Sequence, residues 1–211
     1  MRRVLLITWM GVLGTTAGTM AQTENVEPGG NAPAVVVITQ PPTTILEGLD
    51  RNPGLTVRRL TKVGDVSDDE NGNLAVYAVE IEDRTSKQSA RGLSLVVTQR
   101  IGQASQSART YVDADEIGPL IEGVKALAAL DRDSSATTLA RGVYRTKGNA
   151  TISNIDGSAG RIALVRTIQI SPTTGEVTRS LASYRSTRLA EIIRQFQLAK
   201  DALDKMPKKN E

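Results

Sequence analysis

The 211-residue sequence contains no cysteine and no histidine, and its aromatic side chains are limited to one Trp, one Phe and four Tyr. Without cysteine, disulfides cannot support the fold as they do in many small secreted domains. Without histidine, a Ser-His-Asp or Cys-His catalytic centre is excluded, and without either residue zinc and copper sites lose their commonest ligands. The core must therefore rest on Val, Ile, Leu and Ala, and the sequence indicates no catalytic, cofactor or metal site.

The N-terminal residues follow the order of charge, apolar core and small residues that a signal peptidase recognises. Arginines stand at positions 2 and 3, residues 4–13 are mainly apolar, and Thr19-Met20-Ala21 precede Gln22. We expect a cleaved signal peptide over 1–21 and a mature protein in the periplasm or secreted. The alternative is an uncleaved anchor, although the apolar stretch is shorter than the roughly 20 residues that span a bilayer. No later stretch reaches that length, so we expect no transmembrane segment in the mature chain.

The mature chain divides into a lead and two units of similar plan. Residues 22–54 are polar and rich in Gly and Pro, and we expect a flexible lead with a short edge strand over 35–38 at most. Each following unit, 55–133 and 141–206, shows four strand-like patterns separated by turn residues and then an amphipathic helix. The predicted fold is α+β: two ββββα units in one compact domain, with antiparallel sheets backed by helices. The expected strands are 55–66, 74–81, 92–100 and 108–112 in the first unit, and 142–146, 149–155, 160–170 and 177–184 in the second.

The two helices carry matching apolar stripes, which supports an internal duplication. The first helix is predicted to begin at a capping box formed by Asp113 and Glu116, and the second runs from 186 or 187 to about 205. A shift of 72 residues superimposes the two stripes: Ile117, Leu120, Ile121, Val124 and Leu127 on Leu189, Ile192, Ile193, Phe196 and Ala199.

Charge is distributed unevenly along the chain. Residues 22–70 hold four Lys/Arg and eight Asp/Glu, whereas residues 141–211 hold thirteen Lys/Arg and six Asp/Glu. The basic second unit can complement the acidic first half or can meet an anionic partner. The candidate anion-binding residues are Arg141, Arg145, Lys147, Arg161, Arg166, Arg179 and Arg185.

Two resemblances bear on the architecture. The duplicated ββββα layout resembles the fold of the Whirly proteins and the positive-cofactor-type single-stranded-DNA binders, and residues 147–152 (KGNATI) are similar to the Lys-Gly-Lys-Ala-Ala-Leu motif of the Whirly proteins, with Asn149 in place of its second lysine. Residues 55–206, with Tyr111 to Ile117 at a strand-to-helix junction, resemble a family of exported bacterial proteins of unknown function. These resemblances imply a fold, and a fold does not fix a function.

Three functions remain open at this point. We favour a non-catalytic binding, structural or accessory module with a protein partner in the envelope or exterior. Nucleic-acid binding through the basic unit ranks lower, because single-strand binders stack bases on aromatic side chains and the second unit offers only Tyr144 and Tyr184. A hydrolase that uses only carboxylates would rest on Asp113, Asp115 and Glu116, which are also the residues that a helix N-terminus favours. An open edge strand in either sheet would favour a homodimer.

Overall fold

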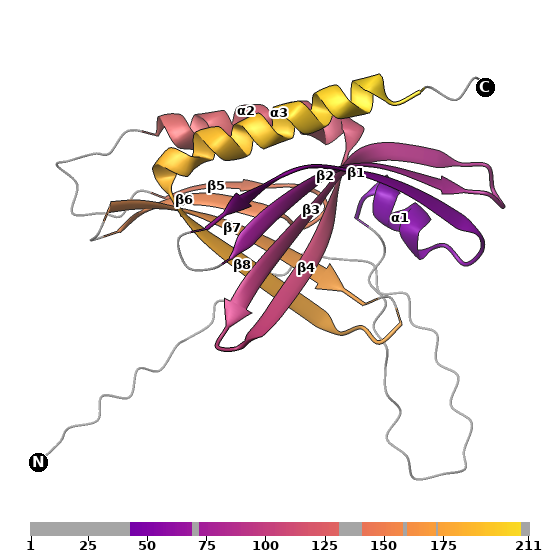
Figure 1. Ribbon diagram of the computed structural model, residues 1–211, viewed down its shortest axis with the longest axis horizontal. Coiled ribbons are helices and arrows are strands. Elements are labelled where there is room, and N and C mark those ends of the chain that lie inside the picture. Colours follow the sequence, from indigo (N-terminus) through magenta and orange to yellow (C-terminus); the bar gives the residue numbers. More distant parts are fainter. Residues whose placement is uncertain (1–42, 69–71, 131–140, 158–159, 172, 208–211) are drawn as a thin grey trace, which may run out of the picture. The chain divides into compact units, whose positions relative to one another are not determined.

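The computed structural model describes residues 43–68, 72–130, 141–157, 160–171 and 173–207 (Figure 1). All of them belong to one compact unit, Val37–Glu211. The expected signal peptide over 1–21 and the candidate edge strand over 35–38 lie outside the described residues.

Two four-stranded antiparallel sheets, each followed by a helix, confirm the predicted fold class. Both sheets are meanders in which sequential strands are neighbours. The first comprises β1 (Thr56–Ser67), β2 (Asn73–Asp83), β3 (Ser89–Ile101) and β4 (Ala104–Asp113), followed by α2 (Ala114–Ala129). The second comprises β5 (Arg141–Arg145), β6 (Thr151–Gly157), β7 (Gly160–Ile170) and β8 (Val177–Arg185), followed by a short 3-10 turn and α3 (Leu189–Lys205).

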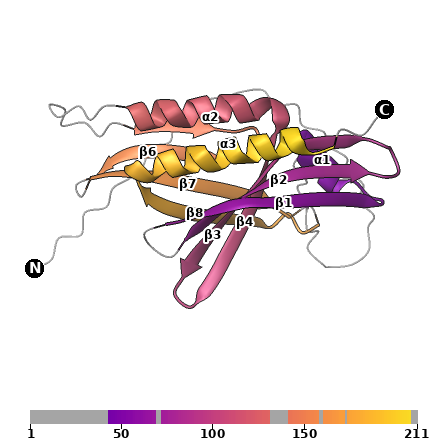
Figure 2. The same cartoon turned by 45° about the horizontal axis from the view of Figure 1, so that its top comes forward.

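The two helices lie side by side over the sheets (Figures 1 and 2); α3 crosses to the sheet of the first repeat, and α2 bridges both sheets. Helix α3, from the second repeat, packs on β1, β2 and β3 of the first sheet, whereas α2 reaches β5 and β6 of the second sheet as well as β3 and β4. Both helices are amphipathic, so each must bury one stripe. The pattern in the sequence predicts which residues of a helix are buried, but the three-dimensional arrangement decides which sheet covers them.

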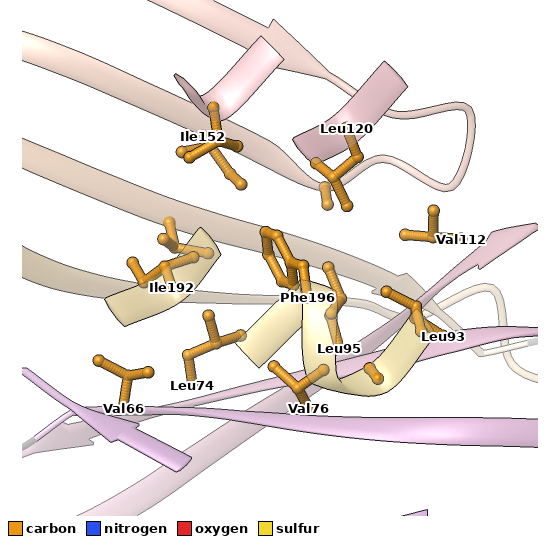
Figure 3. Close-up of a cluster of buried hydrophobic side chains, with 14 of the residues drawn as sticks. Val66, Leu74, Val76, Leu93, Leu95, Val112, Leu120, Ile152, Ile192 and Phe196 are labelled. Carbon is orange, nitrogen blue, oxygen red and sulfur yellow. The ribbon is translucent and has the colours of Figure 1, made fainter. Parts of the chain in front are cut away.

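A single apolar cluster joins both sheets and both helices, with the only phenylalanine, Phe196, at its centre (Figure 3). The predicted α2 stripe is buried from Ile117 to Leu127, but Leu130, which the apolar pattern also includes, is the C-cap residue and is exposed. On α3 the prediction holds except for Ile193, which is half-buried at the border of the cluster, while Leu203 extends the stripe by one turn. The core therefore belongs to the pair of repeats together.

Helix α1 (Ile45–Arg51) corrects the expectation that residues 22–54 form a flexible lead throughout. Its buried Leu46 and Leu49 join a second apolar cluster with residues of the first sheet, and Thr44 caps it by accepting the Glu47 N–H at 3.0 Å. The helix has only seven residues, too few to show a repeating apolar stripe between the prolines and glycines that flank it. Burial against the sheet stabilises it, because isolated helices of this length are unstable in water.

Side chains from the opposite sheet cover part of the strand edges. At the β8 edge, the N–H groups of Leu181 and Ser183 donate to Gln99 Oε1 (3.2 Å) and Asp68 Oδ2 (3.1 Å). At the β4 edge, the Arg109 N–H donates to Gln169 Oε1 at 2.9 Å. Edge strand β1 carries several basic side chains and a register shift between Lys62 and Gly64, features that discourage strand addition. Edge-to-edge homodimerisation is thus discouraged at three of the four sheet edges.

No helix within the described part of the chain is long and apolar enough to cross a membrane.

Candidate functional site

The three carboxylates at the start of α2 make tertiary contacts, and the predicted capping box does not form. Asp113 is the N-cap residue of α2, but its side chain does not cap that helix. Its carboxylate instead accepts the backbone N–H groups of Ile45 (2.8 Å) and Leu46 (3.1 Å). The sequence pattern was right about the helix start and wrong about the hydrogen bonds, because α1 offers unsatisfied N–H groups to the same carboxylate.

Asp115 and Glu116 both bind Lys147, in the turn between β5 and β6. Glu116 Oε1 accepts the Lys147 N–H at 2.9 Å, and Asp115 Oδ2 pairs with Lys147 Nζ at 3.0 Å. The hydrogen bond from Lys147 holds the pKa of Asp115 below its ordinary value, and the same contact raises the pKa of Lys147. Lys147, one of the predicted anion-binding residues, is therefore already paired with a carboxylate.

The turn between β5 and β6 also contacts strand β4 of the first repeat. The Thr110 hydroxyl, on β4, donates a hydrogen bond to the Gly148 carbonyl. A Cβ at Gly148 would collide with the Tyr111 carbonyl oxygen, so the backbones approach too closely for any other residue. In this chain the segment that resembles the Whirly motif thus includes a structural joint between β4 and the second sheet.

A cavity of about 470 Å³ lies beside these carboxylates. Its lining includes Asp113, Asp115 and Lys147 together with residues of α1, whereas Glu116 is not part of the lining. Acid/base hydrolysis of a glycoside needs two carboxylates in distinct protonation states at one cleft. Here Asp113 binds the α1 backbone and Asp115 is ion-paired with a lowered pKa, so the arrangement does not supply that pair. Glu116 is buried, and its Oε2 has no hydrogen-bond donor among the described residues.

The outer face of the second sheet gathers most of the predicted anion-binding residues. Alternate residues of β7 and β8 are buried toward the first sheet, among them Ala163, Val165, Ala182 and Tyr184, so the residues between them face outward. The register of the four strands then defines this face. We call it the arginine face: Val143, Arg145, Thr151, Ser153, Ile155, Ile162, Leu164, Arg166, Ile168, Ile170, Val177, Arg179, Leu181, Ser183 and Arg185.

The arginine face combines exposed cations with aliphatic side chains and contains no Asp or Glu. Arg145 and Arg166 stand in one cross-strand row, two strands apart, a separation of about 10 Å at the backbone. Arg179 is a diagonal neighbour of Arg166 on the next strand, about 7–8 Å away. All three are exposed, and none forms an ion pair or side-chain hydrogen bond with another residue in the described ranges.

The remaining candidates separate from this group. Arg161 points to the opposite side of β7 and donates to the Leu130 carbonyl at the end of α2, where a cation is favoured by the helix dipole. Arg141 pairs through its backbone with Ile155 on β6. The sequence analysis missed the aliphatic half of this face, although the strict alternation of β7 could have revealed it: Ile162, Leu164, Ile168 and Ile170 share their parity with Arg166.

Comparison with protein-family models and with curated proteins gave no match, so the function is argued from this geometry.

Proposed function

We propose that the protein is an exported, non-catalytic binding module that docks an acidic protein surface on its arginine face. The carrying observation is the composition of that face: Arg145, Arg166 and Arg179 stand among aliphatic side chains, with no ion-pair partner among the described residues. The face is partly exposed, with Val143 and Ile162 accessible and Thr151 and Ser153 buried. The proposed location, periplasmic or secreted, rests on the N-terminal sequence pattern.

The arrangement of the tyrosines favours a protein over a nucleic acid as partner. Tyr184 is 1% exposed and its hydroxyl donates to the Val66 carbonyl at 3.0 Å, while Tyr144 packs inward against Gly123. The arginine face therefore has no aromatic platform for base stacking, on which single-strand binders depend. Its Ile, Leu and Val side chains instead match the apolar content of protein interfaces, in which arginine is also enriched.

The size of the face indicates a reversible contact. Four strands spaced about 4.8 Å apart, with up to nine residues at about 3.3 Å each, cover on the order of 500 Å². A standard stable interface uses about 800 Å² from each partner. A second copy of this chain would oppose arginines with arginines if it docked face to face, so charge complementarity selects an acidic partner.

The proposal is tested by affinity capture from the producing cell's envelope with residues 22–211, followed by affinity measurement on the purified partner. The variant R166E/R179E reverses two charges on the arginine face. The matched control, R194E/K200E, makes the same change in net charge on exposed positions of α3. Each measurement is repeated at about 0.1 M and about 1 M salt, between which the Debye length falls from about 10 Å to about 3 Å.

We expect R166E/R179E to weaken binding at least tenfold at the lower salt, and the control to stay within about twofold of the unmodified protein. High salt should reduce this difference, because exposed charges are screened. A partner that both variants bind equally would show that the arginine face is not the interface. A single-stranded oligonucleotide that competes with the partner at this face would replace the acidic protein by a nucleic acid.

A further inference from the structure

A second, smaller cavity lies on the other side of α1, where α1, β1, β4 and β7 meet. Its volume is about 170 Å³, which is space for about five water molecules at their volume in the liquid. Three arginines and two carboxylates line it, together with the phenol of Tyr111 and residues of β7: Arg51, Arg58, Arg109, Glu47, Asp50, Thr110, Ile168, Gln169 and Ile170.

Two of the three arginines are neutralised by carboxylates of α1. Arg51 pairs with Glu47 (2.5 Å) and also donates to the Ile170 carbonyl (3.3 Å). Arg58 pairs with Asp50. These pairs account for both negative charges in the cavity wall.

Arg109 is the cation that remains. It forms no ion pair with any residue in the described ranges, and its Nε is buried without a hydrogen-bond acceptor there. The pKa of Tyr111 is raised, chiefly by burial, and the Arg109 guanidinium partly offsets that rise through its charge and a hydrogen bond with the phenol. A buried guanidinium N–H without an acceptor destabilises the fold. An anion in the cavity would supply the missing hydrogen-bond acceptor.

The positive net charge of the cavity wall and the donor groups of its arginines also suit an anion. The Tyr111 hydroxyl donates a hydrogen bond to Asp50 Oδ2 at 3.0 Å. This bond helps to hold the Asp50 carboxylate beside Arg58. The Arg58 side chain, in the cavity wall, is 46% exposed. The planar donor fork of arginine fits oxyanions, which it binds through paired hydrogen bonds.

We propose that this cavity binds a small tetrahedral oxyanion, phosphate or sulfate, either free or as the terminal group of a small ester. Arg109 supplies the uncompensated charge, and Arg51 and Arg58 supply neighbouring donors without leaving their carboxylates. This site borders the arginine face at Ile168 and Ile170 but uses none of its arginines, and the proposal does not depend on the proposed protein partner.

The test is isothermal titration of residues 22–211 with inorganic phosphate, sulfate and methyl phosphate, with chloride at matched ionic strength as the reference. Variants R109Q and R109K remove and retain the positive charge, and R166Q removes an arginine from the arginine face as a control. Far-UV circular dichroism checks that each variant is folded.

The expected result is saturable binding of phosphate or sulfate over chloride, weakened at least tenfold by R109Q, less by R109K, and within twofold of the original in R166Q. Binding of methyl phosphate would identify a phosphoryl group on a larger ligand, and its exclusion would identify the free anion. The proposal is overturned if the unmodified protein shows no saturable oxyanion binding. Equal binding by a folded R109Q variant also overturns it. If neither Arg109 variant folds, the titration of the unmodified protein against chloride decides.

Discussion

Replacement of Phe196 by Ala tests the central claim about the core, that a helix of the second repeat completes the first sheet. Phe196 is 0% exposed. A buried phenylalanine removes about 150–250 Å² from water, or about 4–6 kcal/mol at about 25 cal/mol per Å². Alanine retains part of that burial and leaves a cavity, so we expect a loss of about 3–5 kcal/mol in the free energy of unfolding. That loss is a large fraction of the total stability of a typical domain.

The assay is urea denaturation of residues 22–211 followed by far-UV circular dichroism, because the only Trp stands at position 9. Two substitutions in the same helix calibrate the result: Leu198 is 41% exposed and Ile193 is half-buried. Leu198→Ala should cost less than about 0.5 kcal/mol, and Ile193→Ala should fall between it and Phe196→Ala. If Phe196→Ala costs no more than Leu198→Ala, α3 does not occupy the position described.

Two further substitutions test the joint between the repeats and the acid sensitivity of the first sheet. Gly148→Ala places a Cβ against the Tyr111 carbonyl, and we expect a loss of about 1–3 kcal/mol by urea denaturation; a neutral effect would mean that the turn does not approach β4 so closely. Glu80, on β2, accepts hydrogen bonds from Arg59 (2.7 Å) and Arg91 (2.9 Å) on the neighbouring strands. Burial acts to raise the pKa of Glu80, but these contacts hold that pKa below its ordinary value of 4.5. Because the pKa of Glu80 is lower in the folded state, its carboxylate stabilises the fold above pH 4.5, and this stabilisation is lost as the pH falls further. Glu80→Gln should therefore flatten the dependence of the free energy of unfolding on pH below 4.5. An unchanged pH dependence would assign the acid sensitivity to other groups.

The repeats, strands and long helices could be predicted because their signals are local. Hairpin turns and alternating apolar residues mark each strand, and two stripes of matching spacing mark α2 and α3. Helix α1 was missed because its stability comes from Leu46 and Leu49 against a sheet distant in sequence. The capping box failed for a related reason: Asp113 has the local pattern of a cap, and only the fold brings Ile45 within its reach.

The candidate site was predicted in part. Positive charge in the second unit was evident, but the sequence analysis treated its cations as one group. Strand parity separates Arg161 from Arg166, which lie five residues apart on one strand and therefore on opposite faces. The pairing of Lys147 with Asp115 and the position of Arg109 in a cavity depend on contacts between the repeats, which no local pattern encodes.

The packing of α3 on the first sheet also affects the order in which the chain can become compact. The side of β1 and β2 that α3 covers lacks this helix until residues 189–205 arrive, and the Tyr184 hydroxyl meets the Val66 carbonyl across 118 positions of sequence. Contacts of such long range form slowly. A nascent chain therefore passes through a period in which the first sheet is built but only partly covered, and this is the interval in which it is most exposed to aggregation.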